Sequence, residues 1–580
     1  MNQKHYLIKG TLLLTVMGLL ARFAGFFYKI FLSRTIGAAQ IGLYQLAIPV
    51  YSFCTALCGG GVQSAISRFA AECRAKEDAR GARRILAAGL FLSVSLSLLI
   101  LTVLYLCAPL IAEKFLLEKS CAILLRLMTF SLPFQMMSSC ICGYFMGAKK
   151  IVPPALAQIL EQLARIATVL FLYTLSIRNG REPGAPLMVF GQIAGEALSA
   201  VYCSGCIFLT DRKCLRPKQS HRKKSRQDSY QGSCQGSCRG SCLGACQGSC
   251  WECFRESWCR FFPTRNAVQK KTETMQQVWR SLLVSVRRIL TMSAPLGANR
   301  MLLCVLQAME AALLPLMLRR AGMTSTEALS VYGTLTGMAL PMILFPTAVT
   351  SALGMLLLPA VSEAQALHED SRLSGTVNAS FLGGLLIGSF CLGVFLLFGE
   401  ALGSTIFHSE LAGIYIRRLA LICPLFYISG TLMSILHGLG KSSIILLWNL
   451  LGFALRFLCI VLLVPSEGMN GYLCGILLDQ FLLTICILYT LRRCGALTIT
   501  ISGALRQTLL PALFGGGAAF VFLFLGEHKI PALASLLVGG GIYCALFFLC
   551  SVFCSFTQLP SVIRLPFKKH TINHHHVKSG

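Results

Sequence analysis

The chain has 580 residues, of which 55% are hydrophobic and 13% are charged, and its formal net charge at pH 7 is +29. Its mean hydropathy of +0.68 is too high for a soluble globular protein and excludes that class. The composition therefore predicts a membrane protein.

Apolar runs of about 20 residues recur along the whole chain, and each is long enough to cross a bilayer. A membrane-spanning segment must satisfy its own backbone hydrogen bonds, so we expect helices; the sequence lacks the alternating pattern of barrel strands. We predict an all-α membrane protein with about 14 transmembrane helices. Their approximate limits are 8–32, 41–65, 85–108, 121–146, 153–177, 186–209, 287–318, 328–357, 376–399, 412–437, 443–464, 470–490, 506–525 and 531–555.

Basic residues concentrate in the connections after the second, fourth, sixth and twelfth predicted helices and in the C-terminal tail. These segments share one side of the membrane if the helices alternate, and an excess of Lys and Arg marks the cytoplasmic side. Both termini are therefore predicted to be cytoplasmic. We expect the first helix to be retained, since no small-residue cleavage site follows it. The positive charge reflects topology and attraction to anionic lipids, and no nucleic-acid partner is expected.

An internal repeat emerges when the sequence is shifted by 291 residues. The shift aligns residues at helix ends or midpoints that are rarer than the aliphatic ones: Gly42 with Gly333, Glu72 with Glu363, Arg126 with Arg417, Pro133 with Pro424, Gly147 with Gly438, Gln158 with Asn449, and Arg165 with Arg456. An even number of helices separates the copies, so the two repeats are parallel. We predict two six-helix units at 1–210 and 287–490, followed by two further helices and a basic tail at 491–580.

The predicted cytoplasmic connection 211–286 contains a low-complexity tract in which Cys234, Cys238, Cys242, Cys246 and Cys250 recur every four residues. A reducing compartment disfavours disulfides, and the Gly and Ser fillers provide no folded core for a zinc site. We interpret the segment as a spacer; metal binding and S-acylation are the alternatives. No metal and no cofactor are expected elsewhere in the chain.

Charged residues inside predicted spans are costly and indicate a cavity or a partner. Arg22 and Arg300 lie at similar depth in the first helix of each repeat, Lys29 lies further along the first helix, and Glu310 lies about three turns beyond Arg300. We predict that these four residues line a cavity for an anionic headgroup, which guanidinium binds through paired donors. The alternative is that they form structural pairs or extend to the membrane surface.

A second polar stripe is predicted on the fifth helix, where Gln158, Glu161 and Arg165 share one face with Gln162. The spacing places Glu161 one turn from Arg165, so an ion pair is expected. Asn449 and Arg456 repeat this stripe on the eleventh helix. Lesser members are Gln192, Glu196 and Asp479.

Three segments carry a family resemblance: GLLARFAGFFYKIFLSRTIGAAQIGLYQLAIPVY, SAPLGANRMLLCVLQAMEAALLPLMLRRAG and VYGTLTGMALPMILFPTAVTSALGMLLLPAVSEA. They resemble the stage V sporulation protein B family of the multidrug/oligosaccharidyl-lipid/polysaccharide exporter superfamily, which also contains lipid II flippases. The resemblance implies two six-helix lobes around a central cavity and alternating access. It also implies that Arg22, Arg300 and Glu310 match charged cavity positions of the family.

The function implied by this resemblance is the flipping of an anionic lipid-linked saccharide, such as lipid II or a polysaccharide unit, across the bacterial plasma membrane. Membrane lipids, a coupling ion and cell-wall synthesis proteins are further candidate partners. A cation-coupled multidrug exporter is the alternative, although the first helix has no Asp or Glu. A membrane enzyme is not expected, because the short outer connections hold no acidic or histidine cluster. A cell-wall assembly scaffold would not need deep arginines.

Overall fold

The computed structural model describes residues 2–76, 78–215, 270–367, 369–499, 501–526 and 532–556. Within these ranges every regular element is a helix, which confirms the predicted all-α class. Most of the predicted spacer, including the five regularly spaced cysteines, lies outside the described residues. The interpretation of that tract therefore stays a prediction.

The part of the chain before the predicted spacer forms eight α-helices. They are α1 (Asn2–Thr35), α2 (Ala38–Gly59), α3 (Val62–Ala75), α4 (Ala79–Leu110), α5 (Cys121–Thr129), α6 (Leu132–Gly147), α7 (Val152–Arg178) and α8 (Pro186–Leu215). A π-helical turn, η1 (Ile111–Phe115), extends α4.

The next described helix has 51 residues, α10 (Lys270–Arg320), and it begins inside the predicted spacer 211–286, so the last part of that predicted segment is helical. It is followed by α11 (Ser325–Thr334), α12 (Leu340–Leu344), α13 (Thr347–Ala366), α14 (Asp370–Phe407), α15 (Glu410–Leu419), α16 (Cys423–Gly438), α17 (Ser442–Glu467), α18 (Met469–Arg493), α19 (Ile501–Gly526) and α20 (Ala532–Phe556). A π-helical turn, η2 (Leu335–Ala339), joins α11 to α12, and a short 3-10 turn, η3 (Ala420–Ile422), joins α15 to α16.

Length and apolar composition qualify twelve stretches of the described helices to cross a membrane, or thirteen if α5 and α6 count as one span bent by 44°. The apolar part of α20, Leu537–Phe553, is shorter than the others. Large apolar side chains also cover the outer surface, as at Phe171, Leu106 and Phe553. This is the surface expected of a protein surrounded by lipid, while the exact number of fourteen spans stays a prediction.

Glycine and proline explain why several predicted spans form as two shorter helices. Gly60 and Gly61 separate α2 from α3, and a side chain at Gly61 would collide with the backbone of Ser293 on α10. The break therefore allows α10 to approach closely. Pro133 and Pro424 each stand in the first turn of the helix after a bend, where the missing N–H of proline costs nothing.

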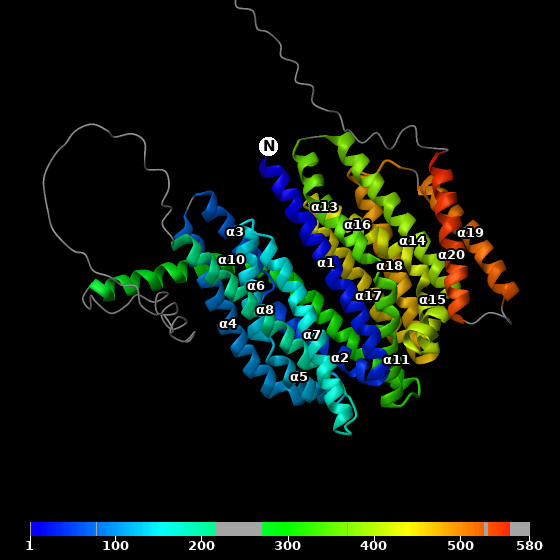
Figure 1. Ribbon diagram of the computed structural model, residues 1–580, viewed down its shortest axis with the longest axis horizontal. Helices are drawn as coiled ribbons and strands as arrows, with labels where there is room; N and C mark the ends of the chain where they lie inside the picture. The colour runs from blue at the N-terminus through cyan, green and yellow to red at the C-terminus, as the bar shows by residue number, and fades with distance from the viewer. Residues whose placement is uncertain are drawn as a thin grey trace, which may run out of the picture.

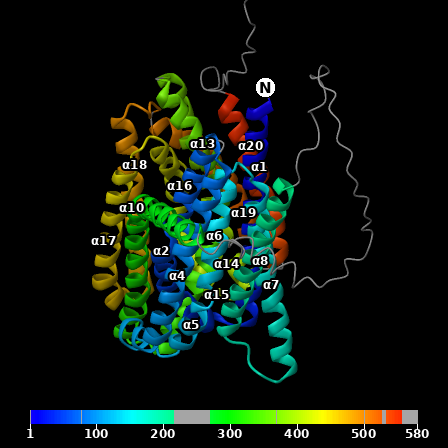
Figure 2. The ribbon, with the colours of Figure 1, turned by 90° about the vertical axis from the view of Figure 1, so that its left-hand side faces the viewer.

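The helices form two groups in Figure 1, with α3 to α8 on one side and α13 to α20 on the other. In Figure 1 the helices α1, α2 and α11 lie between the groups, whereas the first turns of α10 extend past the group of α3 to α8. Figure 2 views the molecule from the side of that group, with α13 to α20 behind it. Helix α1 packs against α7 and α13, whereas α10 packs against α2, α4 and α17. Both long helices thus contact both groups.

The closest approach between α2 and α11 occurs at Gly42 and Gly333, the residues that the 291-residue shift aligns. A β carbon on Gly333 would collide with the backbone of Ala38 and Gly42, and one on Gly42 would collide with the backbone of Leu329. Backbone cannot move aside as a flexible side chain can. Neither position has room for any side chain.

We expect Gly333→Ala to lower the free energy of unfolding by about 1–3 kcal/mol, because the added methyl group overpacks a backbone contact. Thermal unfolding of the purified protein in detergent measures this effect. Gly383→Ala is the matched control, since a β carbon at Gly383 of α14 meets nothing within 4 Å. Equal melting temperatures for the two variants would contradict the prediction.

Candidate functional site

A cavity of about 800 Å³ lies between α1, α2, α7 and the segment from η2 to α13. Its polar lining comes mainly from α1 and α7. The polar lining residues are Arg22, Lys29, Gln45, Gln158, Glu161, Gln162, Arg165, Thr336 and Thr347, and Tyr28 and Tyr44 also contribute to the lining. Three basic side chains and one carboxylate give this lining a formal net charge of +2.

Helix α1 contributes the residues Arg22, Gly25 and Lys29, which lie three or four positions apart and therefore share one helical face. The glycine allows α7 to come near, because a β carbon there would lie 3.3 Å from the side-chain nitrogen of Gln162. Arg22 is exposed and Lys29 is half-buried. The structure thus places both predicted cations of the first helix in one cavity.

Helix α7 contributes the polar stripe. Arg165 Nη2 donates to Glu161 Oε1 at 2.7 Å, and the two side chains are 25% and 27% exposed. This contact confirms the ion pair predicted from the one-turn spacing. Gln158 and Gln162 occupy the same face and also line the cavity. Both are neutral side chains with one hydrogen-bond acceptor and one donor group each.

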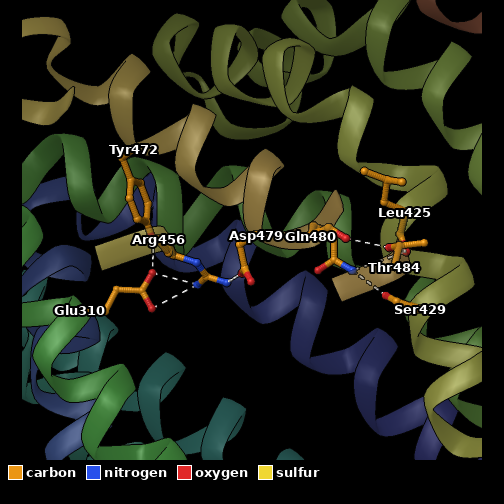
Figure 3. Close-up of polar contacts among 8 residues, drawn as sticks. All are labelled: Glu310, Leu425, Ser429, Arg456, Tyr472, Asp479, Gln480 and Thr484. Carbon is orange, nitrogen blue, oxygen red and sulfur yellow. Dashed lines mark hydrogen bonds and ion pairs between the residues drawn. The ribbon is translucent and has the colours of Figure 1, made fainter. Parts of the chain in front are cut away.

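A second polar cluster lies apart from this cavity, where α10, α17 and α18 meet (Figure 3). Arg456 Nη1 donates to the two carboxylate oxygens of Glu310 at 2.9 and 3.2 Å, and Arg456 Nη2 pairs with Asp479. The hydroxyl group of Tyr472 donates to Glu310 at 2.7 Å. The side chains of Glu310 and Asp479 are only 11% and 8% exposed.

This cluster holds one guanidinium between two carboxylates, so its formal net charge is −1. The arginine is the shared partner of both acids, and removing it would leave two buried charges uncompensated. Figure 3 also shows a neighbouring link, in which Gln480 of α18 donates to Ser429 of α16 at 2.6 Å. Polar contacts therefore join α10, α16, α17 and α18 within the membrane region.

The structure separates the predicted cavity residues into different places. Arg22 and Lys29 line the cavity, whereas Glu310 is an ion-pair partner of Arg456. Arg300 is exposed on α10 and is not among the residues that line the cavity. The physical reason is that α10 packs against α2, α4 and α17, while the cavity is enclosed by α1, α2 and α7.

The predicted second stripe is also divided. Arg456 joins the acidic cluster, and Asn449 of α17 is half-buried outside the cavity lining. Sequence reasoning missed Gln45 and Tyr472. Gln45 carried a usable signal, because it is a polar residue inside a predicted span. Tyr472 carried none, because its role depends on Glu310, which lies 162 residues away in the sequence.

Two sets of contacts close one end of the bundle. Arg34, in the last turn of α1, donates to the carbonyl oxygens of Ile406 and Thr405 at 2.6 and 2.7 Å, at the end of α14. Arg319, near the end of α10, pairs with Glu118 at 2.9 Å. A cation at a helix C-terminus satisfies exposed carbonyl groups and interacts favourably with the helix dipole.

Comparisons with known proteins agree with this architecture. Residues 7–227 match the family model described as polysaccharide biosynthesis protein. The chain is 26% identical to stage V sporulation protein B of Bacillus subtilis (strain 168) over 484 residues, which cover 83% of each chain. It is 28% identical to lipid II flippase MurJ of the same organism over 172 residues, 28% of this chain and 32% of that protein.

Among solved structures, lipid II flippase MurJ in an inward closed conformation matches with a TM-score of 0.63, 10% identity, and coverage of 94% of this chain and 100% of that one. An inward-facing multidrug resistance MATE family transporter of the MOP superfamily matches with a TM-score of 0.56, 14% identity, and coverage of 84% and 98%. These similarities confirm the resemblance predicted from the sequence. The chain is a multi-pass membrane protein with the fold of these transporters.

Proposed function

We propose that this protein moves an anionic lipid-linked saccharide across the bacterial plasma membrane by alternating access. The cavity between α1, α2 and α7, with its net positive lining, carries the proposal. The sequence similarity to stage V sporulation protein B and to lipid II flippase MurJ supports the substrate class. A lipid-linked sugar phosphate suits a site that combines cations with neutral hydrogen-bonding groups.

The lining residues divide into two roles in this proposal. Arg22 and Lys29 bind the phosphate groups, because both are basic side chains on the face of α1 that lines the cavity. Gln45, Gln158 and Gln162 bind sugar hydroxyl or amide groups, because their side chains both donate and accept hydrogen bonds. No residue in this proposal makes or breaks a covalent bond, so the protein acts as a transporter rather than an enzyme.

In the proposed cycle, residues 1–210 and 287–490 form the two units of the transporter. Residues 491–580 are appended to the second unit, and both termini lie in the cytoplasm. The contact of Gly42 with Gly333 supports this division, because residues aligned by the repeat meet each other between the units. With the termini in the cytoplasm, the contacts of Arg34 and Arg319 lie at the opposite end of the bundle and connect the two units there. Those contacts must open for the cavity to face outward.

A cation-coupled multidrug exporter is the second candidate function. The fold similarity to a MATE family transporter and the net negative cluster around Arg456 favour it. The cavity itself argues against a cationic drug, because its lining has the same sign of charge as such a ligand.

The test is reconstitution of the full-length protein into liposomes with fluorescent lipid II on one leaflet. We expect the lipid to become accessible on the opposite leaflet faster than in protein-free liposomes. A cationic dye in the same liposomes tests the exporter. Dye transport without lipid II movement would replace the proposed function with the second candidate.

A further inference from the structure

A second pocket, of about 510 Å³, lies where the first part of α10 packs against α3. It shares no residue with the cavity between α1 and α7. Its lining combines arginines with apolar side chains: Arg68, Phe69, Val284, Arg287, Arg288, Thr291 and Met292. Neither the family resemblance nor the proposed transport assigns it a ligand.

One side of this pocket is fixed by Arg288. Its Nη2 donates to Glu72 Oε2 at 2.7 Å, and its guanidinium lies 4.4 Å from the centre of the Phe69 ring. Glu72 also pairs with Lys76 at 3.3 Å. Arg288 therefore has an acidic partner, which it shares with Lys76, and its side chain connects α10 to α3.

The other two arginines are differently placed. Arg68 and Arg287 are exposed, and neither side chain forms a hydrogen bond or an ion pair with any residue in the described ranges. The hydroxyl group of Thr291 donates to the carbonyl oxygen of Arg287 at 2.9 Å, so it has no proton to offer a ligand. With Glu72 counted, the described residues of the pocket have a formal net charge of +2, and Arg68 and Arg287 are groups that bind phosphate through paired donors.

The position of the pocket matches the boundary between lipid and water. The apolar span of α10 begins at Leu296, and Arg287 precedes it by about 13 Å at the rise of an α-helix. The first turns of α10 run across the direction of the bundle helices in Figure 1. Val284 is 67% exposed and Leu283 is 58% exposed beside the arginines. Apolar and basic groups side by side are typical of a helix in the membrane interface.

We infer that this pocket binds the headgroup of an anionic phospholipid. Arg68 and Arg287 donate hydrogen bonds to the phosphate oxygens, and the acyl chains lie along Phe69, Val284 and Met292. The bound lipid joins α3 to α10, the helix that begins inside the predicted spacer. The inference does not depend on which substrate the other cavity carries.

The experiment uses full-length protein purified in detergent, with thermal stability measured against added lipid. We expect phosphatidylglycerol to raise the melting temperature of the wild type, and phosphatidylcholine or inorganic phosphate to leave it unchanged. In Arg68→Gln/Arg287→Gln the concentration of phosphatidylglycerol needed for half of this effect should rise at least about tenfold, the equivalent of one lost charged hydrogen bond. Arg80→Gln/Arg84→Gln, on two exposed arginines of α4 outside the pocket, should behave as wild type.

Each variant is compared with itself without lipid, so a lower starting stability does not affect the result. Native mass spectrometry of the same preparations counts the phosphatidylglycerol that remains bound. Two results would overturn the inference: an undiminished preference for phosphatidylglycerol in the double variant, or an equal stabilisation of the wild type by inorganic phosphate.

Discussion

Arg22→Gln is expected to reduce lipid II transport per molecule of inserted protein by about ten- to a hundredfold. Glutamine retains a hydrogen-bonding side chain but loses the charge, and a hydrogen bond to a charged group contributes about 1.5–3 kcal/mol. Arg22→Lys should restore part of the activity, because an ammonium group keeps the charge but lacks the planar pair of donors. The measurement is the reconstituted lipid II assay, normalised to the amount of protein in the liposomes.

The matched control for Arg22 is Arg178→Gln. Arg178 is an exposed arginine in the last turn of α7, a helix that lines the cavity, but it is not a lining residue itself. We expect near wild-type transport from this variant. Arg300→Gln belongs in the same experiment, because the sequence predicts a matching role that this structure does not show. A loss equal to that of Arg22→Gln would mean that Arg300 reaches the substrate in another conformation.

The second large effect is expected for stability. Arg456→Met should lower the free energy of unfolding by about 3–5 kcal/mol, because it leaves the buried carboxylates of Glu310 and Asp479 without a cation. Thermal unfolding in detergent and the yield of inserted protein measure the loss. Restoring neutrality with Glu310→Gln and Asp479→Asn in the same chain should recover most of it.

The control for Arg456 is an ion pair of similar length in an exposed setting. Arg417 lies 2.7 Å from Glu400, with both side chains more than half exposed, so Arg417→Met should cost about 1 kcal/mol or less. If both methionine variants unfold at the same temperature, burial does not determine the importance of the pair. The cluster around Arg456 would then have no special structural role.

The sequence predicts the fold well, because the membrane imposes simple requirements. Apolar length and the need for internal backbone hydrogen bonds predict where helices run, and the structure has helices at the predicted positions. The breaks were harder to locate. The helix is interrupted near Gly59–Gly61, where α10 packs closely against the chain. Because α10 is distant in the sequence, no local sequence pattern predicts that contact.

The candidate site shows the same distinction between local and distant contacts. Glu161 and Arg165 are four residues apart, so helical geometry alone predicts their ion pair. Glu310 and Arg456 are 146 residues apart, and only the packing of α10 against α17 brings them together. Depth in the membrane likewise predicts that Arg22 and Arg300 are equivalent, but their helices pack against different neighbours.

The positive lining of the cavity has an electrical consequence for the proposed cycle. When the cavity opens to the outer side of the membrane, its positively charged lining experiences a different electrical potential than when it opens to the cytoplasm. A potential of 100 mV, negative inside, acts on each elementary charge with up to about 2.3 kcal/mol. In the proposed cycle this potential holds an empty cavity of formal charge +2 toward the cytoplasm, whereas the phosphate of a bound lipid-linked saccharide offsets that charge and allows the loaded cavity to turn outward. In the proposed cycle the voltage then favours the return of the empty protein and so contributes to the direction of transport.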